Sequence, residues 1–351
     1  MVPQQEILPG VSYVMPVLNE VQYLERAVHS ILAQEYPGPT EIVLALGPST
    51  DGTDKIVESL KAGDPRIRTV DNPKAAIPSG LNLAIEASTH PVIVRVDAHA
   101  QLPDGYTHRA VETMLRVDAA NVGGVMSAVG RSGVQKAIAR AYNSRLGLGG
   151  GVYHSADVPE GPAESAYLGV MRSEALHQIG GYDESLQRGE DWEMNYRLRE
   201  AGHLVWLDPS LHVRYWPRSS WQALARQFLA TGIWRGELVR RLRGHHPLRF
   251  YAPPVLVTIA AVSVVLAPLG AIFGGMLACL AIAAGAVDVL YLAVLGAASL
   301  QAPDPEFPDS MLDRLRFAGV LATMHFSWGF GFLRGLMHGG RQHHLDRSRH
   351  T

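Results

Sequence analysis

Residues 92–100 read Val-Ile-Val-Arg-Val-Asp-Ala-His-Ala, and this stretch decides the fold. A run rich in β-branched residues predicts a buried strand of the kind found in parallel sheets. The run ends on Asp97 and His99, which are two residues apart and would share one face of a continuing strand. Because carboxylates and imidazoles both bind divalent cations, this strand end predicts a site for a metal ion or for a phosphate bound to one.

The sequence before this stretch alternates between strand-like and helix-like patterns. Strands are expected at residues 11–17, 41–46 and 66–70, and helices at residues 24–32, 53–60 and 77–87. Such alternation predicts an α/β fold with a mostly parallel sheet and helices on both faces. Ligands bind beyond the carboxyl ends of parallel strands, so residues 16–20, 47–51 and 97–99 are expected to converge on one crevice.

A later helical pattern begins with Glu190 and Asp191, directly after Gly189. One acidic residue at a helix start is explained by capping and by compensation of the helix dipole. Two adjacent carboxylates, in a chain that already has a metal-like site, favour general-base chemistry.

A second helical pattern carries Gln227, Trp234 and Arg235 just before an apolar region. The arginine could hold a diphosphate, and the tryptophan could stack on a sugar ring. The alternative is an ordinary juxtamembrane helix with an aromatic residue and basic anchors at the interface.

The glycine-rich stretch at residues 146–152 lacks the strand, turn and helix context of a dinucleotide-binding fingerprint. Two alternatives stay open for it: a loop that closes over the substrate, and a plain solvent loop.

Between Val255 and Leu300 the only charged residue is Asp288, which predicts two membrane spans with a turn within Pro268–Gly275. A third apolar segment, residues 317–333, is near the short limit for a span and either crosses the membrane or lies in its interface. The alternative for the two spans, a pair of buried core helices, is disfavoured because nothing else in the chain is apolar enough to cover both.

The expected organisation has six parts. These are a globular domain at 1–236, a basic juxtamembrane linker at 237–253, a transmembrane hairpin at 254–300, a polar loop at 301–316, a third transmembrane or interfacial helix at 317–337 and a basic tail at 338–351. The arginines before the first span place the globular domain in the cytosol, and Met1–Gly10 lacks the apolar core of a signal peptide. We therefore expect a multi-pass protein of the plasma membrane.

Composition excludes several classes of protein. The net charge of −2 is too balanced to suggest a nucleic-acid partner. The single cysteine, Cys279, excludes an intrachain disulfide and a thiolate metal cluster.

With these residues in hand, the chain resembles the family 2 glycosyltransferases, which have the GT-A nucleotide-sugar-binding fold. It is most similar to the membrane-associated subgroup that includes the succinoglycan glucosyltransferases. The resemblance runs from Val11 to about Arg235. It rests on Val14-Met-Pro-Val-Leu-Asn-Glu20, Glu41-Ile-Val-Leu44, Ser49-Thr-Asp-Gly-Thr53, Asp97-Ala-His99, Gly180-Gly-Tyr-Asp-Glu184, Glu190-Asp191 and residues 227–235.

This resemblance implies inverting transfer of a sugar from a nucleoside diphosphate sugar, with Mg²⁺ or Mn²⁺ at Asp97 and its neighbours. Asp191 would deprotonate the acceptor hydroxyl, with Glu190 beside it. The departing diphosphate develops negative charge, which a divalent ion and Arg235 can neutralise. The implied substrate-binding residues are Pro16, Glu20, Asp51, Lys74, Asn82, Asp97, Gln227, Trp234 and Arg235.

The chain departs from the family pattern in two places. Most relatives have an acidic residue after the second strand, where the nucleobase is held, but Leu46 and Gly47 stand there in this chain. Base recognition must use other groups, with Pro16, Glu20 and Asp51 as candidates, and both uracil and guanine stay open. The usual Asp-x-Asp is Asp97-Ala-His99, so His99 either binds Mn²⁺ or contacts the diphosphate.

We expect the acceptor to be a polyprenyl-diphosphate sugar or a glycolipid, because the predicted anchor holds the enzyme where such lipids lie. Two alternatives are a processive polysaccharide synthase, for which two or three spans make a poor channel, and a catalytically silent scaffold at the membrane. A nucleotide-sugar oxidoreductase is disfavoured because the first strand lacks a Gly-x-Gly-x-x-Gly context.

Overall fold

The computed structural model describes residues 8–131, 133–148, 158–186, 188–242, 246–301 and 310–339. It divides the chain into two compact units. The sheet unit comprises the described residues within Met1–Ser127 and Ser155–Tyr215, and the helical unit those within Ala128–His154 and Trp216–Leu345. The first boundary expected from the sequence, at residue 236, therefore lies inside the helical unit. Residues 149–152 of the glycine-rich stretch, 302–309 of the polar loop and 340–351 of the basic tail lie outside the described residues.

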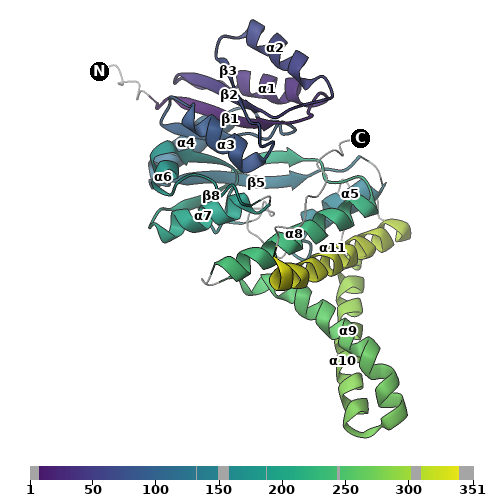
Figure 1. The fold of residues 1–351 in the computed structure, drawn as a ribbon. Coiled ribbons are helices and arrows are strands. Elements are labelled where there is room, and N and C mark those ends of the chain that lie inside the picture. Colours follow the sequence, from purple (N-terminus) through teal and green to yellow (C-terminus); the bar gives the residue numbers. More distant parts are fainter. Residues whose placement is uncertain are drawn as a thin grey trace. The chain divides into compact units, whose positions relative to one another are not determined.

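The sheet has the strand order β3-β2-β1-β4-β7-β5-β8-β6 (Figure 1). Its strands are β1 Val11–Val17, β2 Thr40–Leu46, β3 Ile67–Asp71, β4 Val92–Arg95, β5 Asn121–Ala128, β6 Gly161–Pro162, β7 Tyr167–Arg172 and β8 Val205–Tyr215. Neighbours among the first four strands pair in parallel, as expected. In contrast, β7 pairs antiparallel with β4 and β5, and β6 pairs antiparallel with β8. The sheet is thus mixed, with its parallel half formed by the strand–helix alternation.

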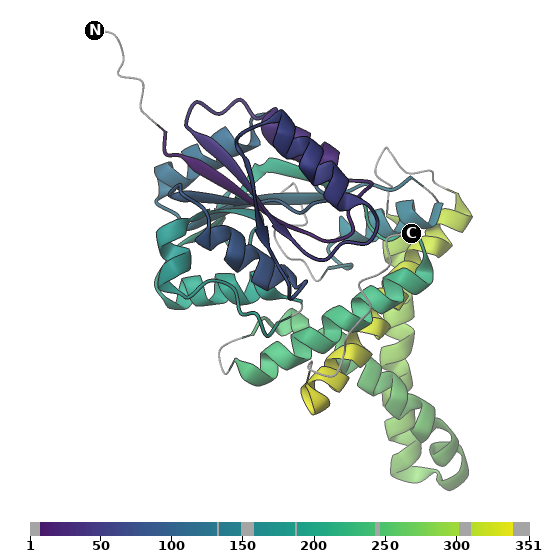
Figure 2. The ribbon, with the colours of Figure 1, turned by 45° about the horizontal axis from the view of Figure 1, so that its top comes forward.

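Helices cover both faces of this sheet (Figure 2). They are α1 Leu24–Leu32, α2 Thr53–Gly63, α3 Ile77–Glu86, α4 Tyr106–Val117, α6 Ser173–Gln178 and α7 Glu190–Glu200. The core on one face takes side chains from α1, α2 and α4, and the core on the other takes them from α3, α6 and α7. In β1, Tyr13 and Met15 enter the first core and Val14 the second, as the two-residue period of a strand requires.

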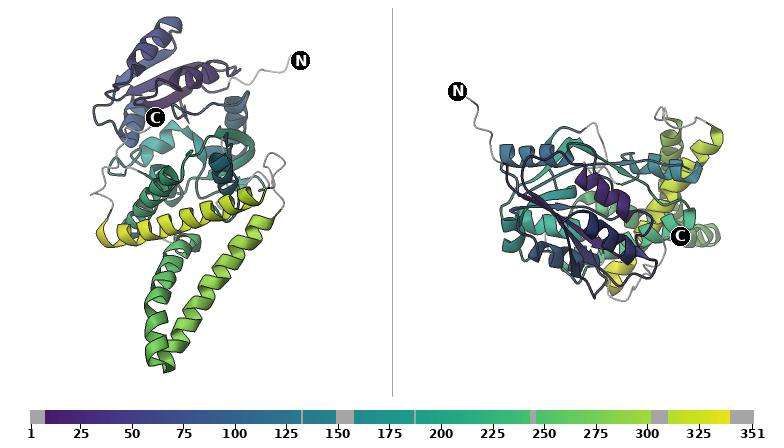
Figure 3. Two further views of the ribbon diagram at one scale, coloured as in Figure 1. Left: turned by 90° about the vertical axis from the view of Figure 1, so that its right-hand side faces the viewer. Right: turned by 90° about the horizontal axis from the view of Figure 1, so that it is seen from above.

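The helical unit is built from long helices. They are α5 Gly133–Tyr142, α8 Trp221–Arg241, α9 Ala252–Phe273, α10 Gly275–Leu300 and α11 Met311–His338, with a short 3₁₀ helix at Leu248–Phe250. Helices α9 and α10 form a hairpin (Figure 3). The turn expected within Pro268–Gly275 is confined to its end, because α9 continues through Pro268 and stops at Gly274, whose φ is 63°. Because Pro268 has no backbone N–H, α9 lacks the hydrogen bond from residue 268 to the carbonyl of Val264.

Two helical segments of the described chain are long and apolar enough to cross a membrane: Leu248–Phe273 with mean hydropathy 2.5, and Gly275–Leu300 with 2.2. Almost none of their residues is buried inside the protein, so they are unlike the core helices of a soluble domain. The third apolar segment lies in α11, which buries Phe317, Val320 and Phe332 within the helical unit.

Helices α8 and α11 lie side by side (Figure 1) and pack through glycines on both sides. A Cβ added at Gly236 would overlap the carbonyl oxygen of Phe332, and one added at Gly335 would overlap that of Ile233. Gly232 and Gly331 make the equivalent contacts one turn away. Each helix therefore carries a Gly-x-x-x-Gly pair, which lets two backbones approach closely. This pairing explains why α11 associates with α8 along its length.

Candidate active site

Two charged residues lie at the carboxyl end of β4. Arg95 is the last residue of the strand and is only 5% exposed, and Asp97 follows two residues later with its side chain 21% exposed. Because they are two residues apart, both side chains leave the backbone on the same side. This is the edge where the sequence predicted the metal-like site.

The start of α7 brings two more carboxylates to this edge. Gly189 precedes the helix with a φ of 78°, a left-handed conformation that favours glycine, and Glu190 and Asp191 form the first turn. The fully buried Asn195 fixes this turn: its Nδ2 donates to the Asp191 carbonyl oxygen at 2.9 Å and to Ser165 Oγ at 3.1 Å. Its Oδ1 accepts from Asn121 Nδ2 at 2.6 Å, which anchors α7 to β5.

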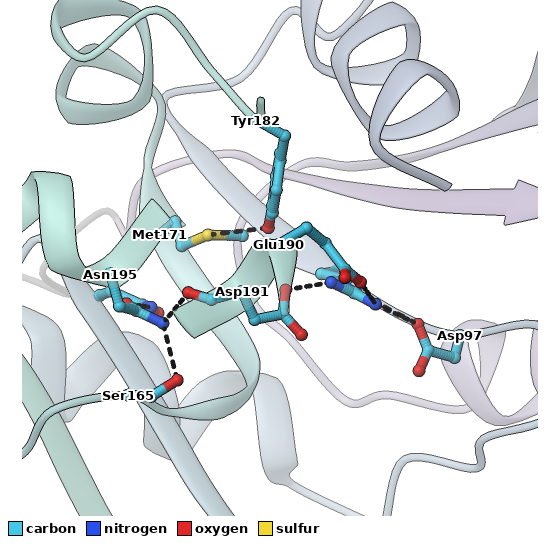
Figure 4. Close-up of polar contacts among 9 residues, drawn as sticks. Asp97, Ser165, Met171, Tyr182, Glu190, Asp191 and Asn195 are labelled. Carbon is cyan, nitrogen blue, oxygen red and sulfur yellow. Dashed lines mark hydrogen bonds and ion pairs between the residues drawn. The ribbon is translucent and has the colours of Figure 1, made fainter. Parts of the chain in front are cut away.

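The guanidinium of Arg95 joins all three carboxylates (Figure 4). Its Nε donates to Asp97 Oδ1 at 3.1 Å, and its Nη2 lies 3.4 Å from Glu190 Oε1. Its Nη1 donates to Asp191 Oδ1 in a short contact. Asp97 and Asp191 are 94 positions apart in the sequence, yet they bind opposite sides of one arginine. The structure therefore brings the side chains of Asp97 and Asp191 together at Arg95.

The shared arginine leaves an excess of negative charge, and the two aspartates differ in pKa. Burial would raise the pKa of Asp97, but Arg95 and His99 outweigh burial and hold it below its ordinary value. Burial raises the pKa of Asp191 to about 7, with Glu190 and Asp97 adding to the rise and Arg95 opposing it. The Asp191 side chain stays 38% exposed, so it is open to an incoming proton. A carboxylate with a pKa near neutrality suits general-base chemistry.

His99 and Glu20 form a further pair near Asp97. His99 Nδ1 lies 3.4 Å from Glu20 Oε1, and the His99 side chain is 43% exposed. Glu20 Oε2 is buried and has no hydrogen-bond partner in the part of the chain that the structure describes. A buried carboxylate oxygen without a donor marks a place for an ion or for a ligand hydroxyl.

These residues fit a divalent cation that is held partly by a substrate. In the described ranges no group of three or more His, Cys, Asp or Glu side chains is arranged to hold a metal ion by itself. Asp97 and His99 are the two protein ligands that the sequence predicts. Mg²⁺ and similar ions usually take one or two protein ligands and complete their coordination with substrate phosphates and water. The donor set suits Mn²⁺ better than Mg²⁺, because imidazole is the softer ligand.

The predicted nucleotide-binding residues of the first loops hold the loops together. Both oxygens of Asp51 accept hydrogen bonds: Oδ1 from the Thr53 backbone and hydroxyl, and Oδ2 from the Val21 backbone at 3.1 Å. These contacts hold the pKa of Asp51 below its ordinary value despite partial burial. Glu20 joins the same loop through its backbone N–H, which donates to Thr53 Oγ1. Pro16 lies in β1, opposite Ala45 of β2.

Lys74 and Asn82 both bind the segment that contains Gly180-Gly-Tyr-Asp-Glu184. Lys74 Nζ lies 2.6 Å from Glu184 Oε2. Asn82 Nδ2 donates to the Tyr182 carbonyl oxygen at 2.9 Å, and Asn82 Oδ1 accepts from the Tyr182 N–H at 2.8 Å. Asn82 therefore ties α3 to the segment that leads into α7.

A pocket of about 470 Å³ opens at the carboxyl ends of β2 and β3. Leu46 and Gly47 line it, so it lies where the sequence placed the nucleobase. Three carboxylates that sequence reasoning missed, those of Asp54, Glu58 and Asp71, also line it. None of Pro16, Glu20 and Asp51 is among its lining residues.

The remaining candidates, Gln227, Trp234 and Arg235, belong to α8 in the helical unit. Gln227 Oε1 accepts from Arg218 Nε at 3.2 Å, and Trp234 is only 2% exposed. The Arg235 guanidinium carbon lies 4.3 Å from the centroid of the Phe250 ring. Trp234 and Arg235 stand between the two glycines that pack α8 against α11, so this packing fixes their positions within the unit.

Comparisons with known proteins show the family to which the chain belongs. The model of glycosyl transferase family 2 matches residues 12–180. The succinoglycan biosynthesis protein ExoA of Rhizobium meliloti is 34% identical over 92% of this chain and 94% of its own length. The chain therefore belongs to glycosyl transferase family 2 and is a glycosyltransferase, as the resemblance predicted.

A more distant relative is a dolichyl N-acetyl-α-D-glucosaminyl phosphate 3-β-D-2,3-diacetamido-2,3-dideoxy-β-D-glucuronosyltransferase of Methanococcus voltae. It is 23% identical over 66% of this chain and 74% of its own length. Among solved structures, the mannosyltransferase PcManGT from Pyrobaculum calidifontis, in complex with GDP-Man and Mn²⁺, superposes with a TM-score of 0.59. It shares 19% identity and covers 91% of this chain and 86% of its own chain, which supports the predicted GT-A fold.

Sequence reasoning missed Arg95, although its signal was present. A lone arginine inside the run Val92-Ile-Val-Arg-Val96 must be buried if the strand is buried. A buried guanidinium requires carboxylate partners, so Arg95 could have indicated a cluster of acids at this end of the strand. Only the fold shows that those acids come from both β4 and α7.

Proposed function

We propose that this protein is an inverting glycosyltransferase that moves a sugar from a nucleoside diphosphate sugar to a membrane-bound, lipid-linked acceptor. The pathway we propose is synthesis of a cell-surface polysaccharide or glycolipid. The observation that carries the proposal is the position of Asp97 and Asp191 on opposite sides of the Arg95 guanidinium. One carboxylate is thereby available to the diphosphate side of a donor, and the other to an acceptor hydroxyl.

Asp191 acts as the general base. It removes the proton from the acceptor hydroxyl while the acceptor oxygen attacks the anomeric carbon and the nucleoside diphosphate leaves. The raised pKa of Asp191, about 7, lets the group take a proton near neutral pH. A single displacement of this kind inverts the anomeric configuration. Glu190 lies beside the base and holds Arg95 from the buried side.

Asp97 and His99 would hold the divalent cation, Mn²⁺ or Mg²⁺. When bound, the cation neutralises charge on the departing diphosphate. Two findings support this assignment: the low pKa of Asp97, which keeps its carboxylate charged, and the neighbour of the same fold that holds GDP-Man and Mn²⁺. Glu20 orients His99 through the contact with its Nδ1.

We assign the nucleobase to the pocket beside Leu46 and Gly47, whose carboxylates can accept hydrogen bonds from ring N–H groups of a base. The roles proposed from sequence for Gln227 and Arg235, contacts with the donor, stay proposals. The buried ring of Trp234 offers no open face for stacking on a sugar. Asp51, Lys74 and Asn82 support the site by holding its loops, in addition to any contact with the donor.

The helices α9 and α10 would cross the plasma membrane as a hairpin, with the sheet unit in the cytosol. The supporting observations are their length, their apolar composition and the arginines that precede them, such as Arg240 and Arg249. The burial of α11 against α8 favours an interfacial position for the third segment. The names of the two curated relatives support an acceptor in polysaccharide or lipid-linked glycan synthesis.

The proposal is tested with the purified full-length protein in nanodiscs, supplied with Mn²⁺, a panel of nucleoside diphosphate sugars and a bacterial lipid extract. We expect one donor to be consumed and its sugar to appear on a lipid product with inverted anomeric configuration. Asp191→Asn should lower kcat by at least about 100-fold, because general-base catalysis contributes that much or more.

Asp183→Asn is the matched control, because Asp183 lies in the neighbouring segment and Asp183 Oδ1 accepts from the backbone N–H of Ser185. It should keep activity within a few-fold of wild type. Retention of the anomeric configuration, or full activity of Asp191→Asn, would overturn the proposed mechanism.

A further inference from the structure

Arg95 is the residue of this site whose task neither the family resemblance nor the proposed chemistry assigns. It is 5% exposed and comes from a strand whose other residues are apolar. Its partners come from two elements: Asp97 follows β4, and Glu190 and Asp191 begin α7. A buried arginine with partners on two elements fixes the distance between them.

The geometry of the contacts is that of a fork. Nε and Nη2 face Asp97 and Glu190, while Nη1 faces Asp191. The planar guanidinium presents its N–H groups in fixed directions, so each carboxylate has one preferred position. A lysine ammonium keeps the charge but has no such fork.

The charges around Arg95 lead to the same conclusion. Three carboxylates surround one cation, and two of them, Glu190 and Asp97, are largely buried. Without the arginine these groups would repel one another and would have to protonate or separate. The two aspartates that we place on the diphosphate side and the acceptor side of the donor would then no longer be held in fixed positions.

We propose that Arg95 is a positioning residue that clamps Asp97 and Asp191 at the separation needed to flank one donor sugar, with Glu190 holding the arginine in place. The inference rests on the proposed function, because it takes Asp191 as the base. Arg95 acts through the two aspartates and does not itself bind the donor. Its loss therefore affects the rate of transfer more than the affinity for the nucleotide.

The first test is Arg95→Lys, measured by transfer kinetics and by thermal shift with the cognate nucleoside diphosphate and Mn²⁺. We expect kcat to fall by roughly 10- to 100-fold, since a misplacement of about 1 Å can cost that much. The Kd of the nucleoside diphosphate should change less than about threefold. A Kd that rises tenfold or more with kcat preserved would show that Arg95 binds the donor, and would overturn the inference.

The second test is a double-mutant cycle with Asp191→Asn. Because Arg95 acts partly through Asp191, adding Arg95→Lys to Asp191→Asn should lower the residual rate by clearly less than the loss that Arg95→Lys causes alone, as residues that act as a unit are not additive. Fully multiplicative losses would overturn the inference. If Asp191→Asn alone were as active as wild type, the proposed base would fail instead, which distinguishes the two failures.

A variant that keeps the arginine covers the case in which Arg95→Lys does not fold. Glu190→Gln removes one of the acids that hold the guanidinium and leaves the charge of Arg95. We expect kcat to fall several-fold, with the nucleoside diphosphate Kd and the Tm close to those of wild type. Unchanged kcat in a folded Glu190→Gln protein would contradict the role of Glu190 in the clamp.

Discussion

Different interactions stabilise the sheet unit and the helical unit. In the sheet unit the site depends on buried charge, with Arg95 joining acids that are far apart in the sequence. In the helical unit the contact between α8 and α11 depends on glycines, and the atoms nearest to these glycines belong to the backbone. Charged networks set the positions of reacting groups, whereas close backbone contact sets the position of a whole helix. Substitutions in the two units should therefore have different effects on activity and stability.

The largest effect is expected for Asp97→Asn in the sheet unit. Removing the carboxylate removes the proposed cation ligand and one partner of Arg95. We expect kcat to fall at least about 100-fold, in line with the loss of one electrostatic group that stabilises a transition state. The thermal shift that Mn²⁺ adds to nucleoside diphosphate binding should disappear. If this Mn²⁺-dependent shift persisted, Asp97 would not be a cation ligand.

The second effect concerns pH. Asp191 works as a base only when ionised, and its pKa is raised to about 7. We expect log(kcat/KM) to fall with a slope approaching one as the pH drops below about 7, since kcat/KM reports the groups of the free enzyme. An activity that stayed constant down to pH 5 would contradict the raised pKa.

The raised pKa of Asp191 also affects the stability of the folded protein, and it does so in the opposite direction with pH. The folded protein binds this proton more tightly than an unfolded chain with the ordinary pKa of 3.8. The stabilising contribution of Asp191 is therefore fully present below about pH 4 and is lost as the pH rises to about 7. Neutral pH thus favours activity at some cost to the stability of the sheet unit.

The third effect lies in the helical unit. Gly236→Ala should destabilise the packing of α8 on α11 by about 1–3 kcal/mol, because the new methyl group overlaps the Phe332 carbonyl oxygen. The measurement is Tm in detergent. Gly285→Ala on α10 is the control, since a Cβ there meets nothing within 4 Å. Equal Tm values for the two variants would mean that the close contact is absent.

The smallest effect is expected for Lys74→Ala. The Lys74 side chain is 70% exposed and its pair with Glu184 lies at the surface, so its loss should cost less than about 1 kcal/mol. Nucleoside diphosphate affinity decides between its two roles. An unchanged Kd would assign Lys74 to the support of the Glu184 segment, and a Kd several-fold higher would assign it to the donor.

Local patterns predicted the parallel half of the sheet, because each strand and helix there is continuous in sequence. The alternation from Val11 to Arg95 gave β1 to β4 and their helices within a few residues. The insertion of β7 beside β4 was not predicted, since strand order is a long-range property and Ala166–Met171 has the same apolar pattern in either direction. The mixed half of the sheet therefore appeared only in the structure.

The candidate site was likewise predicted only in its local features. Asp97 and Asp191 were predicted from their local settings, at a strand end and at a helix start. Arg95 was not, because its meaning depends on partners from another element. The helical unit adds a second case: Gly232-x-x-x-Gly236 and Gly331-x-x-x-Gly335 are visible in the sequence, yet neither shows which helix it contacts.

The most direct measurement is an experimental structure of the full-length protein bound to its nucleoside diphosphate sugar and Mn²⁺ in the absence of acceptor. The central claim predicts the diphosphate beside Asp97 and the anomeric carbon between Asp97 and Asp191, with the Asp191 carboxylate facing the acceptor side. A donor sugar bound with Asp191 on the diphosphate side, or beyond reach of the anomeric carbon, would contradict it.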